Sequence, residues 1–145
     1  MNPRTKEVAE STAWLHLEND TTIGRLAVVT NGVPEIFPVN FAVDGRTIVF
    51  RTTVGTKLHE LTLYSSVVFE ADRWEEKAGW SVIVHGEARV FDDDAEIQRA
   101  GELLEIPWQT DVEAEFVRII PSEITCRSTN FGTEHWEGET PTWWR

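Results

Sequence analysis

Two tight-turn signals constrain the fold of this chain more than any other feature of its sequence. Asn31-Gly32 is the strongest short-range signal for a two-residue hairpin turn, and Asp44-Gly45 repeats that chemistry a strand's length later. The segments around these turns are rich in apolar and β-branched residues, which is typical of strands. They predict a three-strand antiparallel meander over 23–30, 33–43 and 46–52.

The rest of the chain alternates between helical and strand patterns. The further predicted elements are an N-terminal helix over 6–18, a short helix over 55–63, a strand over 66–71, a polar connection over 72–79, a long strand over 80–91, a helix from 92 to 105, and strand-like segments over 115–120 and 123–128. Asp92–Asp94 caps the long helix and Pro107 ends it. Gly86 indicates a bulge or a close backbone approach, and Pro121 separates the last two segments.

This order of elements predicts the fold class. Tight hairpins and about six alternating strands favour a mainly β, mostly antiparallel barrel with a few helices. The length of 145 residues suits one domain over 1–145, with residues 1–18 as its N-terminal helix and 129–145 as a C-terminal tail.

Charge and composition limit the classes of binding partner that we expect. The net charge of −12 disfavours nucleic acid and anionic membrane surfaces. The single cysteine, Cys126, allows no intrachain disulfide, and no apolar run approaches the roughly 20 residues of a membrane span. The start of the chain has no apolar signal-peptide segment, so we expect a cytoplasmic protein.

The segment over 50–58 is the most informative one for chemistry. A strand ends in Arg51 and Thr52, Gly55 allows a tight turn, and a helix begins at Thr56 and Lys57. Cations and hydroxyls beside the free N–H groups of a helix start form a site for a phosphate monoester. A plain strand–turn–helix joint with solvated charges is an equally good interpretation from these residues alone.

Two other segments are candidates for holding a flat ligand. Pro38, Val39 and Asn40 lie between two phenylalanines, and Pro34 and Pro38 together predict an edge, bulged or bent strand. Trp80 and Ser81 open the long strand, where an indole and a hydroxyl can form a wall beside a ring. The alternatives are a bent core strand and an ordinary core tryptophan.

Other constellations are weak. None of the four histidines is spaced as a metal pair, so no metal site is predicted. They are His16, His59, His85 and His135. The sequence shows no nucleophile motif and no distinct carboxylate pair, and the catalytic residues stay unknown.

The ordered set of these segments resembles the pyridoxamine 5′-phosphate oxidase-like flavoproteins, most closely their short flavin-nucleotide-binding branch. The resemblance runs from about residue 15 to 127. It is carried by Gly24-Arg25-Leu26-Ala27, Gly32-Val33-Pro34, Pro38-Val39-Asn40-Phe41, Phe50-Arg51-Thr52, Gly55-Thr56-Lys57-Leu58, Val68-Phe69-Glu70 and Gly79-Trp80-Ser81-Val82 with Val84, Gly86 and Ala88.

The resemblance implies a split β-barrel homodimer with FMN at the subunit interface. It assigns the FMN phosphate to Arg51, Thr52 and Lys57, with Thr56 nearby. It lays the isoalloxazine ring along Pro38, Val39 and Asn40, with Trp80 and Ser81 lining the same groove. Only Arg127 matches the Gly-Arg-Arg segment of this branch, and the substrate-phosphate residues of the true oxidases are not found, so that activity is not expected.

Three functions follow as hypotheses. The first is an FMN-dependent oxidoreductase acting on a small molecule, with NADH or NADPH as candidate donor, because the cofactor can carry the chemistry without a catalytic side chain. The second is a non-catalytic store or sensor that binds a flavin, a deazaflavin or haem. The third is an interaction module with a dead site.

Overall fold

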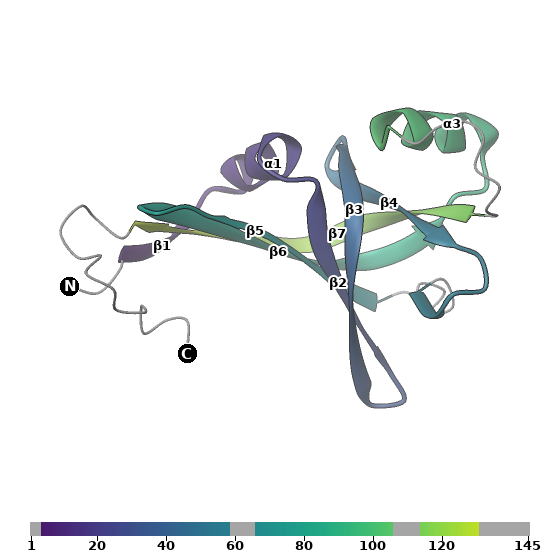
Figure 1. Ribbon diagram of the computed structural model, residues 1–145, viewed down its shortest axis with the longest axis horizontal. Helices are drawn as coiled ribbons and strands as arrows, with labels where there is room; N and C mark the ends of the chain where they lie inside the picture. The colour runs from purple at the N-terminus through teal and green to yellow at the C-terminus, as the bar shows by residue number, and fades with distance from the viewer. Residues whose placement is uncertain (1–3, 59–65, 106–113, 131–145) are drawn as a thin grey trace.

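The computed structural model describes residues 4–58, 66–105 and 114–130 and consists of a curved, mainly β molecule with two helices on one side (Figure 1). In chain order its elements are β1 (Arg4–Val8), α1 (Glu10–Asn19), β2 (Ile23–Thr30), β3 (Val33–Asp44), β4 (Thr47–Thr53), β5 (Ser66–Trp74), β6 (Ala78–Val90), α3 (Asp94–Leu103) and β7 (Ala114–Asn130).

The strands close into an antiparallel barrel. The sheet order is β1-β7-β4-β3-β2-β5-β6, and an additional pairing of β6 with β7 closes the six strands β2–β7 into a ring. β2, β3 and β4 form the meander, and β5 returns beside β2, which is the Greek-key order. β1 pairs only with the end of β7 and lies outside the closed barrel. The predicted mainly β, antiparallel, Greek-key-like barrel is confirmed.

Two hydrophobic clusters hold the barrel together. The interior cluster contains Phe50 and Phe69, both with 0% exposure, and α1 adds Trp14 and Leu17 to it. A smaller cluster lies under α3, on the outer face of β4. Its buried members are Val49, Phe91 and Ala100. β4 is therefore buried on both faces along most of its length.

The turns of the meander follow the predicted chemistry with one shift. Asn31 and Gly32 have φ values of 52° and 76°, as the predicted type I′ turn requires. The second turn consists of Gly45 and Arg46, because Asp44 is still paired in the β3–β4 ladder. Gly45 has a φ of 63° at the first turn position, which is typical of a type II′ turn.

The N-terminal helix was predicted too early in the chain. Residues 6–8 belong to β1, because the free edge of β7 offers them a ladder that local propensity does not reveal. The hydroxyls of Thr5 and Thr129 meet there at 3.0 Å. The helix itself begins at Glu10. Thr129 and Asn130, predicted as tail, are the last residues of β7, and 131–145 lie outside the described residues.

The polar connection predicted over 72–79 is mostly strand. β5 and β6 pair as far as Trp74 and Gly79, so only residues 75–77 form the turn. Of its polar residues, Asp72 and Arg73 belong to β5, and Glu75, Glu76 and Lys77 form the turn. At Gly79 a Cβ would lie 2.0 Å from the ring of Trp74, so this close contact requires glycine.

The predicted break at Pro121 is also wrong, since β7 is one continuous strand. Gly86 pairs with Pro121 and His85 with Glu123, which leaves Ser122 as the extra residue of a bulge. The bulge absorbs the proline, and the Ser122 hydroxyl donates to the His85 carbonyl at 3.1 Å. A Cβ at Gly86 would lie 2.4 Å from the Ile120 carbonyl oxygen, so the predicted bulge and close approach at Gly86 are confirmed.

The predicted cap of the long helix is confirmed. The Asp93 side chain accepts a hydrogen bond from the Ala95 N–H at 2.8 Å. α3 ends at Leu103, two residues short of the predicted 105, and Pro107 lies outside the described residues. Residues 57–58 are helical, while 59–63 of the predicted short helix lie outside the described part.

Candidate functional site

The barrel is split between β3 and β4. The two strands pair only from Phe41 with Phe50 to Asp44 with Thr47. Below Phe41, residues 33–40 of β3 pair with β2, and residues 51–53 of β4 pair with β7. Two strand edges therefore face each other without pairing, and both predicted site segments lie on them.

The prolines of β3 fit this open edge. Phe41 donates its N–H to the Thr22 carbonyl at 2.9 Å, toward β2. Alternate residues of a strand turn their N–H groups to the same side, so Pro34 and Pro38 stand where an N–H would point into the split. The predicted edge strand is confirmed for this part of β3.

Arg51 and Thr52 point in opposite directions. Thr52 is turned to the interior with 2% exposure, and its hydroxyl donates to the Glu115 carbonyl at 3.4 Å. Arg51 is half-buried on the outer face, opposite Phe116 of β7. Within the described part of the chain Arg51 forms no hydrogen bond or ion pair, so its guanidinium is available to a ligand.

The turn after β4 carries Thr56 and Lys57, and it lies beside the split. Gly55 has a φ of 86°, a backbone conformation that favours glycine. The Thr56 hydroxyl donates to the Thr53 carbonyl at 2.7 Å. The Lys57 ammonium forms an ion pair with Glu35 of β3 at 2.5 Å, so this salt bridge spans the split.

The facing residues of β3 alternate between the two faces. Val39 is turned inward with 6% exposure, whereas Pro38 and Asn40 are exposed on the outer face. Pro38, Val39 and Asn40 thus lie on one side of the split, and Arg51, Thr52, Thr56 and Lys57 follow one another on the other side. Pro38, Asn40, Thr56 and Lys57 are exposed, and Arg51 is half-buried.

Trp80 and Ser81 lie on β6, which does not border the split in this chain. Trp80 is turned inward with 6% exposure and stacks on His16, with ring centroids 4.5 Å apart and planes at 14°. Ser81 is turned outward between Asp72 of β5 and Arg127 of β7. The structure therefore places these two predicted residues apart from the other seven.

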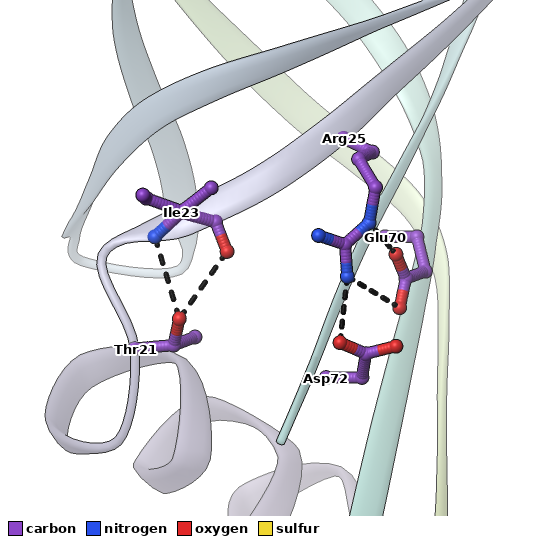
Figure 2. Close-up of polar contacts among 5 residues, drawn as sticks. All are labelled: Thr21, Ile23, Arg25, Glu70 and Asp72. Atoms are coloured by element: carbon purple, nitrogen blue, oxygen red, sulfur yellow. Dashed lines mark hydrogen bonds and ion pairs between the residues drawn. The ribbon is translucent and has the colours of Figure 1, made fainter. Parts of the chain in front are cut away.

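An ion-pair cluster beside Pro38 was missed by the sequence analysis (Figure 2). Arg25 of β2 is paired in register with Pro38 on one side and Glu70 on the other. Its Nε lies 2.7 Å from a Glu70 carboxylate oxygen, and its Nη2 lies 2.6 Å from Asp72. In the same view the Thr21 hydroxyl donates to the carbonyl of Ile23 and accepts from its N–H, at the point where α1 leads into β2.

Two carboxylates share one guanidinium in this cluster, and the pKa of one of them, Glu70, is shifted. Burial and the neighbouring Asp72 raise the pKa of Glu70, although the hydrogen bond from Arg25 opposes the shift. The hydrogen bond with Glu70 raises the pKa of Arg25, so the arginine stays charged. Arg25 and Glu70 both belong to the resembling segments, but only the register of β2 and β5 shows that they meet.

Other site classes find no support in the described ranges. No group of three or more His, Cys, Asp or Glu side chains there could hold a metal ion. None of the described helices is long and apolar enough to cross a membrane.

Comparison with known proteins identifies the family. The profile of a family described as pyridoxamine 5′-phosphate oxidase matches residues 9–128, and the chain belongs to this family. An uncharacterized protein of Mycobacterium tuberculosis, Rv0080, is 30% identical over 143 residues, which cover 86% of this chain and 93% of that protein. The predicted family resemblance is confirmed.

Solved structures confirm the split-barrel fold. An FAD-binding protein from Mycobacterium smegmatis is 36% identical, with a TM-score of 0.79, and the match covers 88% of this chain and 100% of that one. A protein described as FAD-binding from Mesorhizobium loti has the same fold at 18% identity, with a TM-score of 0.73 over 86% of this chain and 97% of that one.

Proposed function

We propose that this protein binds a flavin nucleotide, FMN, in the split between β3 and β4. The observation that carries the proposal is Arg51, a half-buried guanidinium without a partner in the described chain, at the open edge of β4, with Lys57 on the turn that follows this strand. A guanidinium and an ammonium that both come from the end of one strand and its turn suit a phosphate. Pro38, Val39 and Asn40 on the facing edge are the proposed support of the ring.

The choice of FMN rests on the number of cations at the site. Arg51 and Lys57 are the described cations on the two edges, and one phosphate monoester satisfies both. The Mycobacterium smegmatis relative is described as binding FAD, whose diphosphate and adenosine need further contacts. FAD is therefore the second candidate ligand.

A homodimer would complete the site. Ser81 is turned outward on β6 and does not border the split of its own chain, so in this proposal it acts on the flavin of a second copy, whereas the inward-turned Trp80 does not reach that flavin. The β2–β3 hairpin supports such an assembly, because Val29 and Ile36 on its outer face are 64% and 65% exposed. Apolar side chains exposed side by side favour a protein partner.

The proposed activity is oxidation or reduction of a small molecule, and the flavin when bound would supply the hydride and electron transfer. In the proposed roles Arg51 and Lys57 bind, Pro38 and Asn40 orient, and the apolar interior around Val39 excludes water. We propose the cytoplasm as its compartment, since the buried Cys126 is a free thiol. A flavin store or sensor without turnover is the alternative function.

Titration of the purified protein with FMN and with FAD tests the proposal, followed by flavin fluorescence and the visible spectrum. We expect saturable, stoichiometric binding that is tighter for FMN. Tighter binding of FAD would replace the cofactor, and no binding of either would contradict the flavin site. Steady-state oxidation of NADH or NADPH by the loaded protein then separates an enzyme from a store.

A further inference from the structure

A hollow separate from the split lies where α1 meets the far ends of β5, β6 and β7. Its volume is about 390 Å³, at the lower end of the range for small-molecule sites. His16 and Asp20 of the α1 end, Arg73 of β5, Trp80 of β6 and Ser128 of β7 line it. Neither edge of the split contributes a residue to this lining.

His16 is held in one tautomer. Its Nδ1 lies 2.6 Å from a carboxylate oxygen of Asp20, one helical turn later. An ionised carboxylate only accepts hydrogen bonds, so Nδ1 must carry the proton in the neutral ring. The lone pair of the neutral imidazole is then on Nε2, the nitrogen that can take a proton from another group.

Further contacts hold the ring of His16 and the backbone of Asp20 in place. The Trp80 indole, itself buried, stacks on the imidazole at 4.5 Å and sets the plane of the ring. Asp20 ends α1, and its N–H donates to the His16 carbonyl at 3.0 Å. Its own carbonyl accepts a hydrogen bond of 3.0 Å from Arg73. A fixed ring hydrogen-bonded to a carboxylate is the arrangement that makes a histidine an effective proton acceptor.

We propose that His16 and Asp20 form a proton-accepting pair that binds, in this hollow, a small neutral ligand with a weakly acidic hydroxyl, such as a phenol or an enol. The hydroxyl proton passes to Nε2 of His16, the electron pair of the O–H bond stays on the ligand oxygen, and Asp20 stabilises the imidazolium. Arg73, which also pairs with Glu75 at 3.2 Å, is the cation on the described lining. The Ser128 hydroxyl is a second polar group on the lining.

A purely structural role makes different predictions. A charged histidine at a helix C-terminus stabilises the helix, and Asp20 would then serve only as its counter-ion. In that case His16→Gln would lower stability without any effect on a ligand. The two roles are separable because one concerns unfolding and the other concerns a bound hydroxyl.

The test uses the full chain without flavin, so its outcome does not depend on the proposed cofactor. The probe is p-nitrophenol, which absorbs visible light when it is ionised. We expect saturable binding with a larger ionised fraction than in buffer at the same pH. His16→Gln should weaken binding by about tenfold, the factor that a hydrogen bond to a charged group carries. His85→Gln, a change of an exposed histidine outside the hollow, should leave binding unchanged.

A measurement on the unchanged protein guards against a variant that fails to fold. The ring nitrogens of His16 in ¹⁵N NMR spectra should show Nδ1–H and a bare Nε2, and the Nε2 signal should move when p-nitrophenol binds. A proton on Nε2 in the free neutral ring would overturn the proposal. So would the absence of saturable binding, or equal binding by wild type and His16→Gln.

Discussion

The two ends of the β3–β4 pair differ in how they satisfy charge. At the closed end, where the strands pair, Asp44 accepts hydrogen bonds from Arg99 at 2.9 Å and lies 3.0 Å from Arg118. Burial alone would raise the pKa of Asp44, but these two arginines hold it below its ordinary value. At the open end Arg51 has no such partner in the described chain.

The same two strands therefore carry a structural ion-pair network at one end and an available cation at the other. The difference indicates where the fold is complete within one chain and where it is arranged for a ligand. Buried charges that serve stability are paired, whereas a binding site leaves a charge for the ligand to satisfy.

Removing the ion pairs at the closed end should lower the stability of the fold and leave flavin binding unchanged. Asp44→Asn removes the negative charge that pairs with Arg118, whose side chain is only 11% exposed. We expect a loss of about 3 kcal/mol in the free energy of unfolding, since an uncompensated charge remains buried. Urea unfolding measures it, with Asp92→Asn, an exposed acid, as the control. If the Asp44→Asn protein were as stable as wild type, the ion pairs at the closed end would not serve stability, and the two ends would not differ in the way described.

Removing the unpaired cation at the open end should weaken flavin binding and leave the stability of the fold unchanged. Arg51→Ala deletes a group with no internal partner, so stability should hardly change. FMN affinity should fall roughly ten- to a hundredfold, the loss expected for one charge-assisted phosphate contact. Fluorescence titration measures it, and Arg46→Ala, an exposed turn arginine, is the matched control. Unchanged affinity in the Arg51 variant would show that the phosphate lies elsewhere.

Removing the ion-pair partner of Lys57 should strengthen FMN binding at the open end. Glu35 competes with the phosphate for the Lys57 ammonium across the split. Because the pair is largely exposed, Glu35→Gln should raise FMN affinity by only about two- to fivefold. Glu87→Gln, which removes an exposed acid of β6, controls for the overall charge. Weaker binding by Glu35→Gln would indicate that the ion pair shapes the site rather than competing with the ligand.

The two carboxylates with shifted pKa values should give stability opposite pH dependences. The lowered pKa of Asp44 adds stability above its ordinary value of 3.8, and this stability is lost as the pH falls through and below that value. The raised pKa of Glu70 favours the protonated folded form, so its contribution is lost as the pH rises above the ordinary value of 4.5. Glu70→Gln should therefore flatten the fall in stability above pH 4.5, which urea unfolding at several pH values measures. An unchanged slope would contradict the shift of Glu70.

Local signals predicted the meander well. The strand 23–30 has its predicted bounds, and Asn31-Gly32 forms the predicted turn because its backbone preference is intrinsic. The cap at Asp93 was predictable for the same reason. Each of these features depends on residues that are neighbours in the sequence.

Features that depend on distant partners were not predictable. β1 exists because β7 has a free edge, and β7 passes Pro121 because β6 accommodates a bulge. Alternation along β6 shows that Trp80 and Ser81 face opposite sides, but only the packing shows that Trp80 turns inward onto His16. The segment 50–58 was correctly singled out as the end of a strand, yet the split that faces it needed the register of both strands.

Amide NMR shifts of the full chain on addition of FMN test the flavin site between β3 and β4 directly. The largest shift changes should fall on residues 36–40 and 51–57, the two edges of the split, and they should shrink in Arg51→Ala. Changes confined to the closed end around Asp44, or spread over β6 without the split, would contradict a flavin site in the split.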